Sequence, residues 1–231
     1  MRTDLTDITL LLDRSGSMNM VRDDTIGGVN TFVADQAKSP GSALFTLVQF
    51  DNEYECVYAG RPVAEAPLLD QATFVPRGST SLYDAICRAM TDTGMRLDAI
   101  PEADRPGMVI FAIMTDGCEN SSQSKTIHDV NAMISEQRDK YNWQIVFLAA
   151  NQDAIAAASK MGINPGLAMS YAHSRSGVKN AMAATSANII SARGMMYSTG
   201  DAQAARKHVA YTVSQRRTQD EEIDRVRRST K

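Results

Sequence analysis

Long apolar runs that lack the alternation of a half-exposed strand are the feature that most constrains the fold of this chain. One run covers residues 8–12, with only Thr9 interrupting it, and a second covers residues 108–114. A strand covered on both faces of a parallel sheet reads in this way, because neither face meets water. We therefore expect a largely parallel sheet that has helices on both sides.

The rest of the chain alternates between strand and helix patterns. Further strands are expected at residues 43–50, 53–58, 144–148 and 167–171, the second of which turns back antiparallel on the first. Apolar residues at helical spacing predict helices at residues 21–37, 82–97, 125–141, 153–161 and 178–192. This order is typical of a doubly wound α/β fold, Rossmann-like, with a mainly parallel central sheet and one antiparallel edge strand.

The chain is expected to divide into a domain at residues 1–200 and a charged C-terminal tail at residues 201–231. The tail is dense in charge and poor in apolar residues. The pairs Glu221–Arg225 and Asp224–Arg228 have the i, i+4 spacing that supports an exposed helix. We expect a solvated or loosely docked helix; a docking arm for a partner, or a basic contact to nucleic acid, is the alternative.

Three short polar segments carry oxygen donors, at residues 13–17, 78–81 and 115–117. Asp13 and Asp116 each end a predicted buried strand, so both carboxylates are expected at one edge of the sheet, where open α/β sheets bind ligands. Thr80 comes from a glycine-containing loop that opens a helix and can reach the same edge. The candidate site residues are Asp13, Ser15, Ser17, Thr80 and Asp116.

Hydroxyls and carboxylates are hard ligands, which indicates Mg²⁺, with Mn²⁺ or Ca²⁺ as the other possibilities. Magnesium takes about six oxygens and usually keeps some water, so the five candidate side chains leave at least one position open. A metal that is held mainly by neutral hydroxyls stays electron-poor. It can therefore attract an anion from outside the chain.

In these residues the chain resembles a von Willebrand factor A (VWA) domain with a metal-ion-dependent adhesion site (MIDAS). The family pattern is Asp-x-Ser-x-Ser, then a loop Thr, then Thr-Asp-Gly; all five candidate positions match it, and the resemblance covers roughly residues 5–195. It implies that a Glu or Asp of a partner protein fills the vacant metal position, and hence an adaptor role. Intracellular microbial relatives often work beside AAA+ ATPases or in stress-response systems, so the resemblance implies an AAA+ ATPase as one partner.

Several residues near these motifs have a less specific role. Arg14 is expected to face solvent, where it could steer an acidic partner towards the metal. Asp23 and Asp24 are expected to cap a helix, with tuning of the metal as the alternative. Asn120 follows the Thr-Asp-Gly segment closely and could brace the loop beside the metal ligands.

Composition favours a cytoplasmic protein that does not bind nucleic acid in general. The formal net charge is −3, from 24 Lys and Arg against 27 Asp and Glu, so there is no general basic field. No apolar run approaches the ~20 residues of a membrane span, and the N-terminus lacks the pattern of a secretory signal. Cys56, Cys87 and Cys118 are odd in number and widely separated, which argues against disulfides and zinc.

We expect a binding module and no enzyme. The chain has neither a Gly-x-x-x-x-Gly-Lys-Ser/Thr phosphate loop nor a Gly-x-Ser-x-Gly nucleophile elbow. His128, His173 and His208 fall outside the oxygen-donor motifs and are expected to be surface or structural residues. Two alternatives stay open: a metal-assisted hydrolase, because an open magnesium position could activate water, and an RNA-associated VWA module that uses the basic tail.

Overall fold

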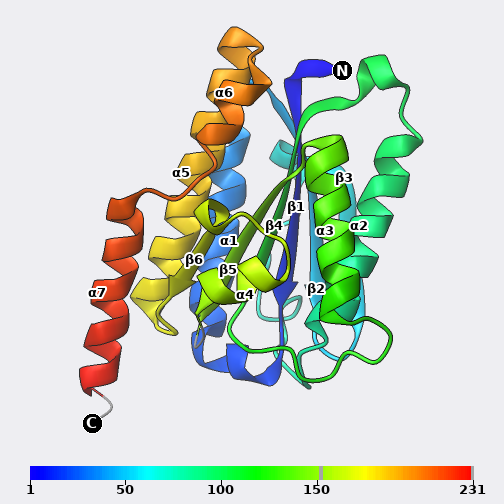
Figure 1. Cartoon of the computed structure of the whole chain (residues 1–231). Coiled ribbons are helices and arrows are strands. Elements are labelled where there is room, and N and C mark those ends of the chain that lie inside the picture. Colours follow the sequence, from blue (N-terminus) through cyan, green and yellow to red (C-terminus); the bar gives the residue numbers. More distant parts are fainter. Residues whose placement is uncertain (151–152, 230–231) are drawn as a thin grey trace.

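The structure, a computed structural model, describes residues 1–150 and 153–229 and has a twisted sheet at its centre (Figure 1). Within these residues the sheet has six strands in the order β3-β2-β1-β4-β5-β6. Their bounds are β1 (Arg2–Asp13), β2 (Ser42–Phe50), β3 (Tyr54–Pro62), β4 (Pro106–Thr115), β5 (Gln144–Ala150) and β6 (Ala168–Tyr171). The β2–β3 pair is antiparallel and the other neighbouring pairs are parallel, which confirms the predicted fold class.

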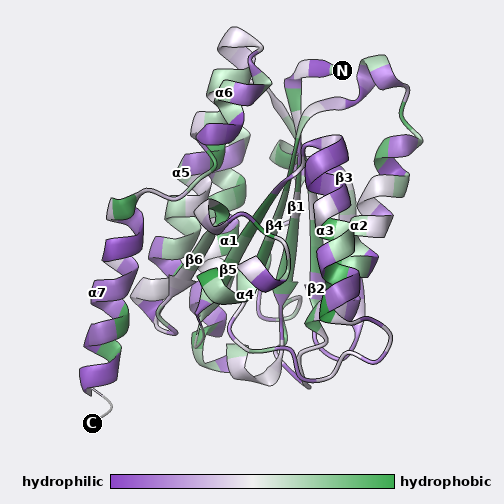
Figure 2. Cartoon of the chain, viewed as in Figure 1, coloured by the Kyte–Doolittle hydropathy of each residue, from purple (hydrophilic) through white to green (hydrophobic). Residues whose placement is uncertain are grey.

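The two apolar runs form the central strands β1 and β4. Ile8, Leu11, Phe111 and Ile113 are fully buried, as expected for strands covered on both faces. Strand β1 begins at Arg2, earlier than the predicted residue 8, because residues 2–4 are not buried and carry no apolar signal, and because Thr6 and Asp7 are polar although they are buried. In Figure 2 the sheet is mostly hydrophobic in colour, whereas the last helix is mostly hydrophilic.

Helices cover both faces of the sheet. Helices α1 and α5 pack against each other on one face, and α2 and α3 lie on the other (Figure 1). Their bounds are α1 (Arg22–Lys38), α2 (Leu82–Asp98), α3 (Ile127–Tyr141), α4 (Ala154–Lys160), α5 (Arg175–Thr199), α6 (Ala202–Lys207) and α7 (Val213–Ser229). Short 3₁₀-helices occur at η1 (Gly16–Val21), η2 (Val63–Glu65), η3 (Glu102–Asp104) and η4 (Pro165–Leu167). None of the described helices is both long and apolar enough to cross a membrane.

Helix α5 is longer than the predicted helix at residues 178–192. It extends at both ends to residues that cap it, and these lie outside the apolar stripe. The Ser174 hydroxyl accepts a hydrogen bond from the Gly177 N–H and so caps the first turn. At the other end, Gly200 has a φ of +68°, a left-handed conformation that ends the helix at low cost for glycine. Apolar periodicity alone marked only the buried middle of this helix.

The C-terminal tail packs against the domain more closely than we expected. Val209 and Tyr211 are buried in the main hydrophobic core, and the Tyr211 hydroxyl lies 2.6 Å from the Thr185 hydroxyl. Helix α7 docks mainly through polar side chains. Gln219 donates to the Gly177 carbonyl at 3.0 Å, and Glu222, although acidic, is buried where it accepts hydrogen bonds from serine hydroxyls of the β6–α5 segment.

Candidate metal centre

Asp13 and Asp116 lie side by side at the carboxyl edge of the sheet. Strands β1 and β4 are hydrogen-bonded neighbours, with Leu12 opposite Met114, so the residues that follow each strand meet at the same edge. Both aspartates are buried, with relative exposures of 0% and 1%. The structure therefore brings together the two carboxylates that the apolar runs had placed at this edge.

The Asp13 carboxylate is held by the turn that follows it and by strand β4. Its Oδ1 accepts the Ser15 N–H at 2.6 Å, and its Oδ2 accepts the Thr115 hydroxyl at 2.6 Å. The pKa of Asp13 rises from its ordinary value of 3.8 to about 6, because burial disfavours the charged form more than these hydrogen bonds favour it. The neighbouring charge of Asp116 adds to the rise.

The two serines connect the first segment to Asp116. The Ser17 hydroxyl donates to Asp116 Oδ1 at 2.7 Å, and the Ser15 and Ser17 hydroxyl oxygens are 3.2 Å apart. Ser15 is buried, whereas Ser17 is exposed, so the group of oxygens opens to solvent on one side. A side chain of another molecule could enter from that side.

Thr80 reaches the same place from the loop before α2. A Cβ added at Gly117 would lie 3.5 Å from Thr80 Oγ1, which puts this hydroxyl beside the backbone that follows Asp116. Asn120 accepts the Thr80 N–H at 2.9 Å and donates its own N–H to the Thr80 carbonyl at 3.1 Å. Asn120 therefore joins the segment that follows Asp116 to the loop that carries Thr80.

Hydrogen bonds thus link Asp13, Ser15, Ser17 and Asp116, and the Thr80 hydroxyl lies beside the backbone that follows Asp116. The chemistry of these oxygens fits a hard divalent cation. Two buried carboxylates at close quarters are costly unless a positive charge neutralises them. Among the described residues, no group of three or more His, Cys, Asp or Glu side chains could hold a metal by itself. A cation at this edge would therefore need the hydroxyl oxygens of Ser15, Ser17 and Thr80 as well. That these residues bind a metal stays a prediction.

The sequence alone did not indicate that His173 belongs to this site. Its Nε2 lies 2.9 Å from Asp116 Oδ2, and the side chain is mostly buried. His173 stands two residues after β6, at the same sheet edge, and this position was the available signal. Tyr171, the last residue of β6, helps to hold this edge together by donating its hydroxyl to the Thr115 carbonyl at 3.1 Å.

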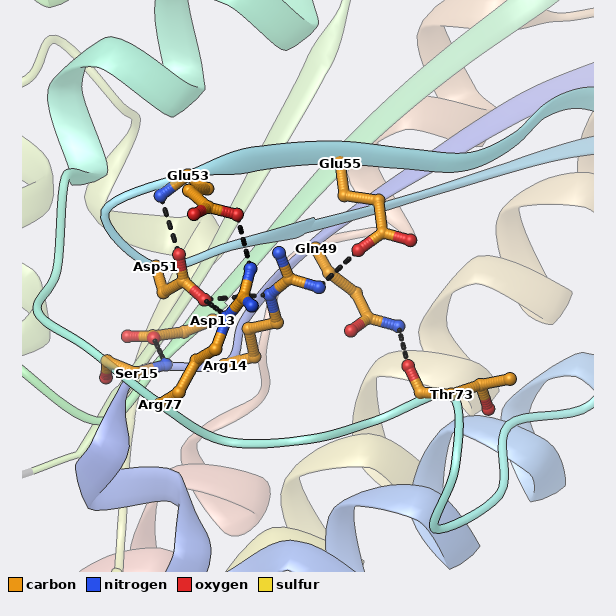
Figure 3. Close-up of polar contacts among 9 residues, drawn as sticks. All are labelled: Asp13, Arg14, Ser15, Gln49, Asp51, Glu53, Glu55, Thr73 and Arg77. Carbon is orange, nitrogen blue, oxygen red and sulfur yellow. Dashed lines mark hydrogen bonds and ion pairs between the residues drawn. The ribbon is translucent and has the colours of Figure 1, made fainter.

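The expectation that Arg14 faces solvent was wrong. Its side chain is only 7% exposed, and it forms ion pairs with Asp51 and Glu55 (Figure 3). Asp51 directly follows β2, which neighbours β1 in the sheet, and Glu55 lies on β3, which pairs with the other side of β2. Asp23 and Asp24 lie in the first turn of α1, where the helix dipole favours acidic side chains, but neither caps the helix: the N-cap residue is Val21, which makes no side-chain capping hydrogen bond. Asp24 pairs with Arg175 at 3.2 Å.

Comparisons with known proteins support the fold. No protein-family model matches the chain, and no curated protein matches it. The pilus adhesin SpaC from Lactobacillus rhamnosus GG has a TM-score of 0.58 at 16% identity, with 80% of this chain and 30% of SpaC covered. Proximal thread matrix protein 1 from the mussel byssus has a TM-score of 0.55 at 15% identity, with 77% and 46% covered. The ArnB paralog VWA2 from Sulfolobus acidocaldarius has a TM-score of 0.50 at 17% identity, with 79% and 45% covered.

This chain therefore spans less than half the length of each of these three proteins. At such low identity the likeness establishes the fold alone. The chain is an α/β protein with the Rossmann-like architecture that VWA2 also has, and it carries a cluster of hard oxygen donors at the carboxyl edge of its sheet.

Proposed function

We propose that this chain is a metal-dependent protein–protein interaction module of the VWA type. In this proposal Asp13, Ser15, Ser17, Thr80 and Asp116 form a MIDAS that holds Mg²⁺, directly or through water, and Mn²⁺ or Ca²⁺ could replace it. The bound cation supplies a vacant position for an Asp or Glu carboxylate of a partner protein. The chain's own residues orient the donors and keep one side of the site open.

The observation that carries the proposal is the convergence of three distant segments on two buried carboxylates. The Ser17 hydroxyl donates to Asp116, and the oxygens of Ser15 and Ser17 are in contact. Burial raises the pKa of Asp13 to about 6, so at neutral pH the site carries negative charge that the fold itself does not fully neutralise. A divalent cation would remove this cost.

We propose binding, and no catalysis, for this site. Hydroxyl-rich coordination suits the capture of an external carboxylate, and the imidazole closest to the site, that of His173, lies against Asp116. The partner is proposed to be a protein with an exposed acidic residue, such as an AAA+ ATPase, for which the chain would serve as adaptor. We propose a cytoplasmic location, because Cys56, Cys87 and Cys118 are reduced cysteines, as is usual in the cytosol.

The proposal is tested by titrating the intact chain with Mn²⁺ and following the free ion by electron paramagnetic resonance. Wild-type protein should bind one Mn²⁺ ion, and Mg²⁺ should compete for the same site. Asp116→Ala should bind Mn²⁺ at least about tenfold more weakly, as for loss of other residues that support a metal site. Asp24→Ala is the matched control, since Asp24 lies in the first turn of the neighbouring helix and outside the donor group. Equal binding by Asp116→Ala and the wild type would refute the proposal.

A second arm tests the partner. Protein captured by the immobilised chain in Mg²⁺ should be released by EDTA, and Asp116→Ala should fail to capture it. The Asp24→Ala control should behave as the wild type. Capture that persists both in EDTA and with the Asp116→Ala chain would show that binding does not use the metal.

A further inference from the structure

Asp51 is a buried carboxylate next to the metal centre, and it lies outside the predicted ligand group. It follows β2 directly, and its relative exposure is 0%. Its Oδ2 accepts hydrogen bonds from Arg14 Nε at 3.0 Å and from Arg77 Nε at 2.9 Å, while its Oδ1 accepts the Glu53 N–H at 2.6 Å (Figure 3). One carboxylate therefore holds two arginines from different segments.

The two arginines belong to the segments that carry the predicted metal ligands. Arg14 stands between Asp13 and Ser15, and Arg77 begins the loop that leads to Thr80. The backbones of the two segments are also joined, because the Arg77 N–H donates to the Arg14 carbonyl at 2.8 Å. Asp51 thus ties the first and second ligand segments to the end of β2.

The backbone of Asp51 serves the same junction. Its carbonyl accepts the N–H of Ser81, the residue after Thr80, at 3.0 Å. A displacement of Asp51 would therefore reach the Thr80 loop through the side chain of Arg77 and through this backbone bond. Metal ligands must be held to within about half an ångström of their productive places, so such a displacement would weaken coordination.

The other carboxylates of this network contribute less to its rigidity. Glu55 pairs with Arg14 and Glu53 with Arg77, but the two glutamate side chains are 54% and 63% exposed. Exposed ion pairs are screened by water and contribute little, whereas removing one partner of a buried pair leaves a charge without compensation. Asp51 is the buried member on which both arginines converge.

Charge gives Asp51 a second effect on the metal. The Arg14 guanidinium is a buried cation on the same segment as three predicted ligands, and it would repel a divalent ion nearby if nothing balanced it. Asp51 supplies this balance at 3.0 Å. Neutralising Asp51 would therefore weaken metal binding both by loosening two segments and by exposing the site to the charge of Arg14.

We infer that Asp51 is a positioning residue for the metal centre, which holds the Asp13–Ser17 segment and the Thr80 loop in their binding arrangement. The inference rests on the proposed function. It assigns to Asp51 an effect on metal affinity that is separable from its effect on folding.

Asp7 offers a matched control for Asp51. It too is a fully buried aspartate that pairs with an arginine, since Arg96 donates to it at 2.8 Å and 2.9 Å. It lies in the middle of β1, opposite Leu44, whereas Asp13 ends the strand opposite Phe50. Asp7→Asn therefore breaks a comparable buried pair away from the metal edge.

The experiment measures Mn²⁺ affinity by calorimetry and unfolding by urea in EDTA, on the intact wild type, Asp51→Asn and Asp7→Asn. We expect Asp51→Asn to raise the Kd for Mn²⁺ by about tenfold or more, as for other residues that orient metal ligands. Asp7→Asn should leave the Kd within about twofold of the wild type while it also lowers stability.

A second variant keeps the test decisive if Asp51→Asn does not fold. Arg77→Met removes a half-exposed arginine and cuts the side-chain link to the Thr80 loop without leaving a buried charge unpaired, and it should still raise the Kd by a few fold.

The possible outcomes separate the inference from the proposed function. If the wild type binds Mn²⁺ and Asp51→Asn, or failing that Arg77→Met, binds it equally well, the inference is overturned and the proposed function stands. If Asp7→Asn weakens binding as much as Asp51→Asn does, the effect is one of general stability and the inference is again overturned. If the wild type itself binds no Mn²⁺, the proposed function fails.

Discussion

Replacing Asp13 by asparagine should stabilise the metal-free protein, although Asp13 is a buried and hydrogen-bonded residue. Burial raises the pKa of its carboxyl from 3.8 to about 6 in the folded state. The folded chain then holds the Asp13 proton more tightly than the unfolded chain does. The native state consequently loses stability as the pH rises from the unfolded pKa of 3.8 through the folded pKa of about 6, above which the carboxylate is charged.

The size of this effect follows from the two pKa values. A difference of about 2 pKa units corresponds to about 3 kcal/mol of destabilisation at neutral pH, at about 1.4 kcal/mol per unit. Asparagine removes the charge but offers one acceptor oxygen for the two donors, Ser15 N–H and the Thr115 hydroxyl. The lost hydrogen bond lowers the free energy of unfolding by only about 1 kcal/mol. The loss is small because the Thr115 hydroxyl also lies 3.1 Å from the Gly117 carbonyl and can donate to it instead.

The net expectation for Asp13→Asn in EDTA at pH 7.5 is a gain of about 1–2 kcal/mol, or roughly 2–8 °C in Tm. The assay is thermal and urea unfolding from pH 4 to 8. Wild-type stability should include a component that is lost as the pH rises from about 4 to about 6, and the variant should lack it. With Mg²⁺ at about 100 times Kd the wild type should become the more stable of the two proteins, because Mg²⁺ binding stabilises only the wild type, by ~2.7 kcal/mol.

Two results would refute this reasoning. A lower stability of Asp13→Asn in EDTA would show that the carboxylate is not destabilising in the metal-free fold. If Mg²⁺ stabilised Asp13→Asn as much as it stabilises the wild type, Asp13 would not be needed for metal binding.

The C-terminal tail supports two further predictions. Truncation before Asp201 removes Val209 and Tyr211 from the core, so urea unfolding should show a free energy of unfolding that is lower by several kcal/mol, as for the deletion of large core side chains. Removal of residues 213–231 alone should lower it less, because Val209 and Tyr211 remain. Glu222→Ala removes the acceptor for the Ser174 and Ser176 hydroxyls, so trypsin should cut α7 faster than in the wild type; an unchanged rate would show that this contact does not hold the helix.

The class of fold could be predicted from the sequence because burial leaves a local record. An apolar run without alternation reports a strand covered on both faces, and this holds for β1 and β4 wherever they lie in space. Helix ends were less predictable. Helix α5 extends beyond its apolar stripe to the capping Ser174 and to Gly200, which the periodicity did not include.

The candidate ligands could also be named from the sequence, because each belongs to a short motif at a strand end or helix start. The placement of Asp13 and Asp116 could be predicted from the rule that the carboxyl ends of parallel strands lie at the same edge of the sheet. The contacts of Ser17 with Asp116, and of Thr80 with the segment after it, follow from that placement.

The sequence by itself determined the sheet, its covered strands and the oxygen donors at its edge, since these depend on neighbouring residues in the chain. Only the tertiary structure decided that Arg14 is buried against Asp51, that His173 lies against Asp116, and that α7 docks through Gln219. Each of these contacts joins distant segments through polar side chains. Such pairs follow no hydropathy pattern, because the same residue types are equally compatible with water until strand order and packing bring their partners together.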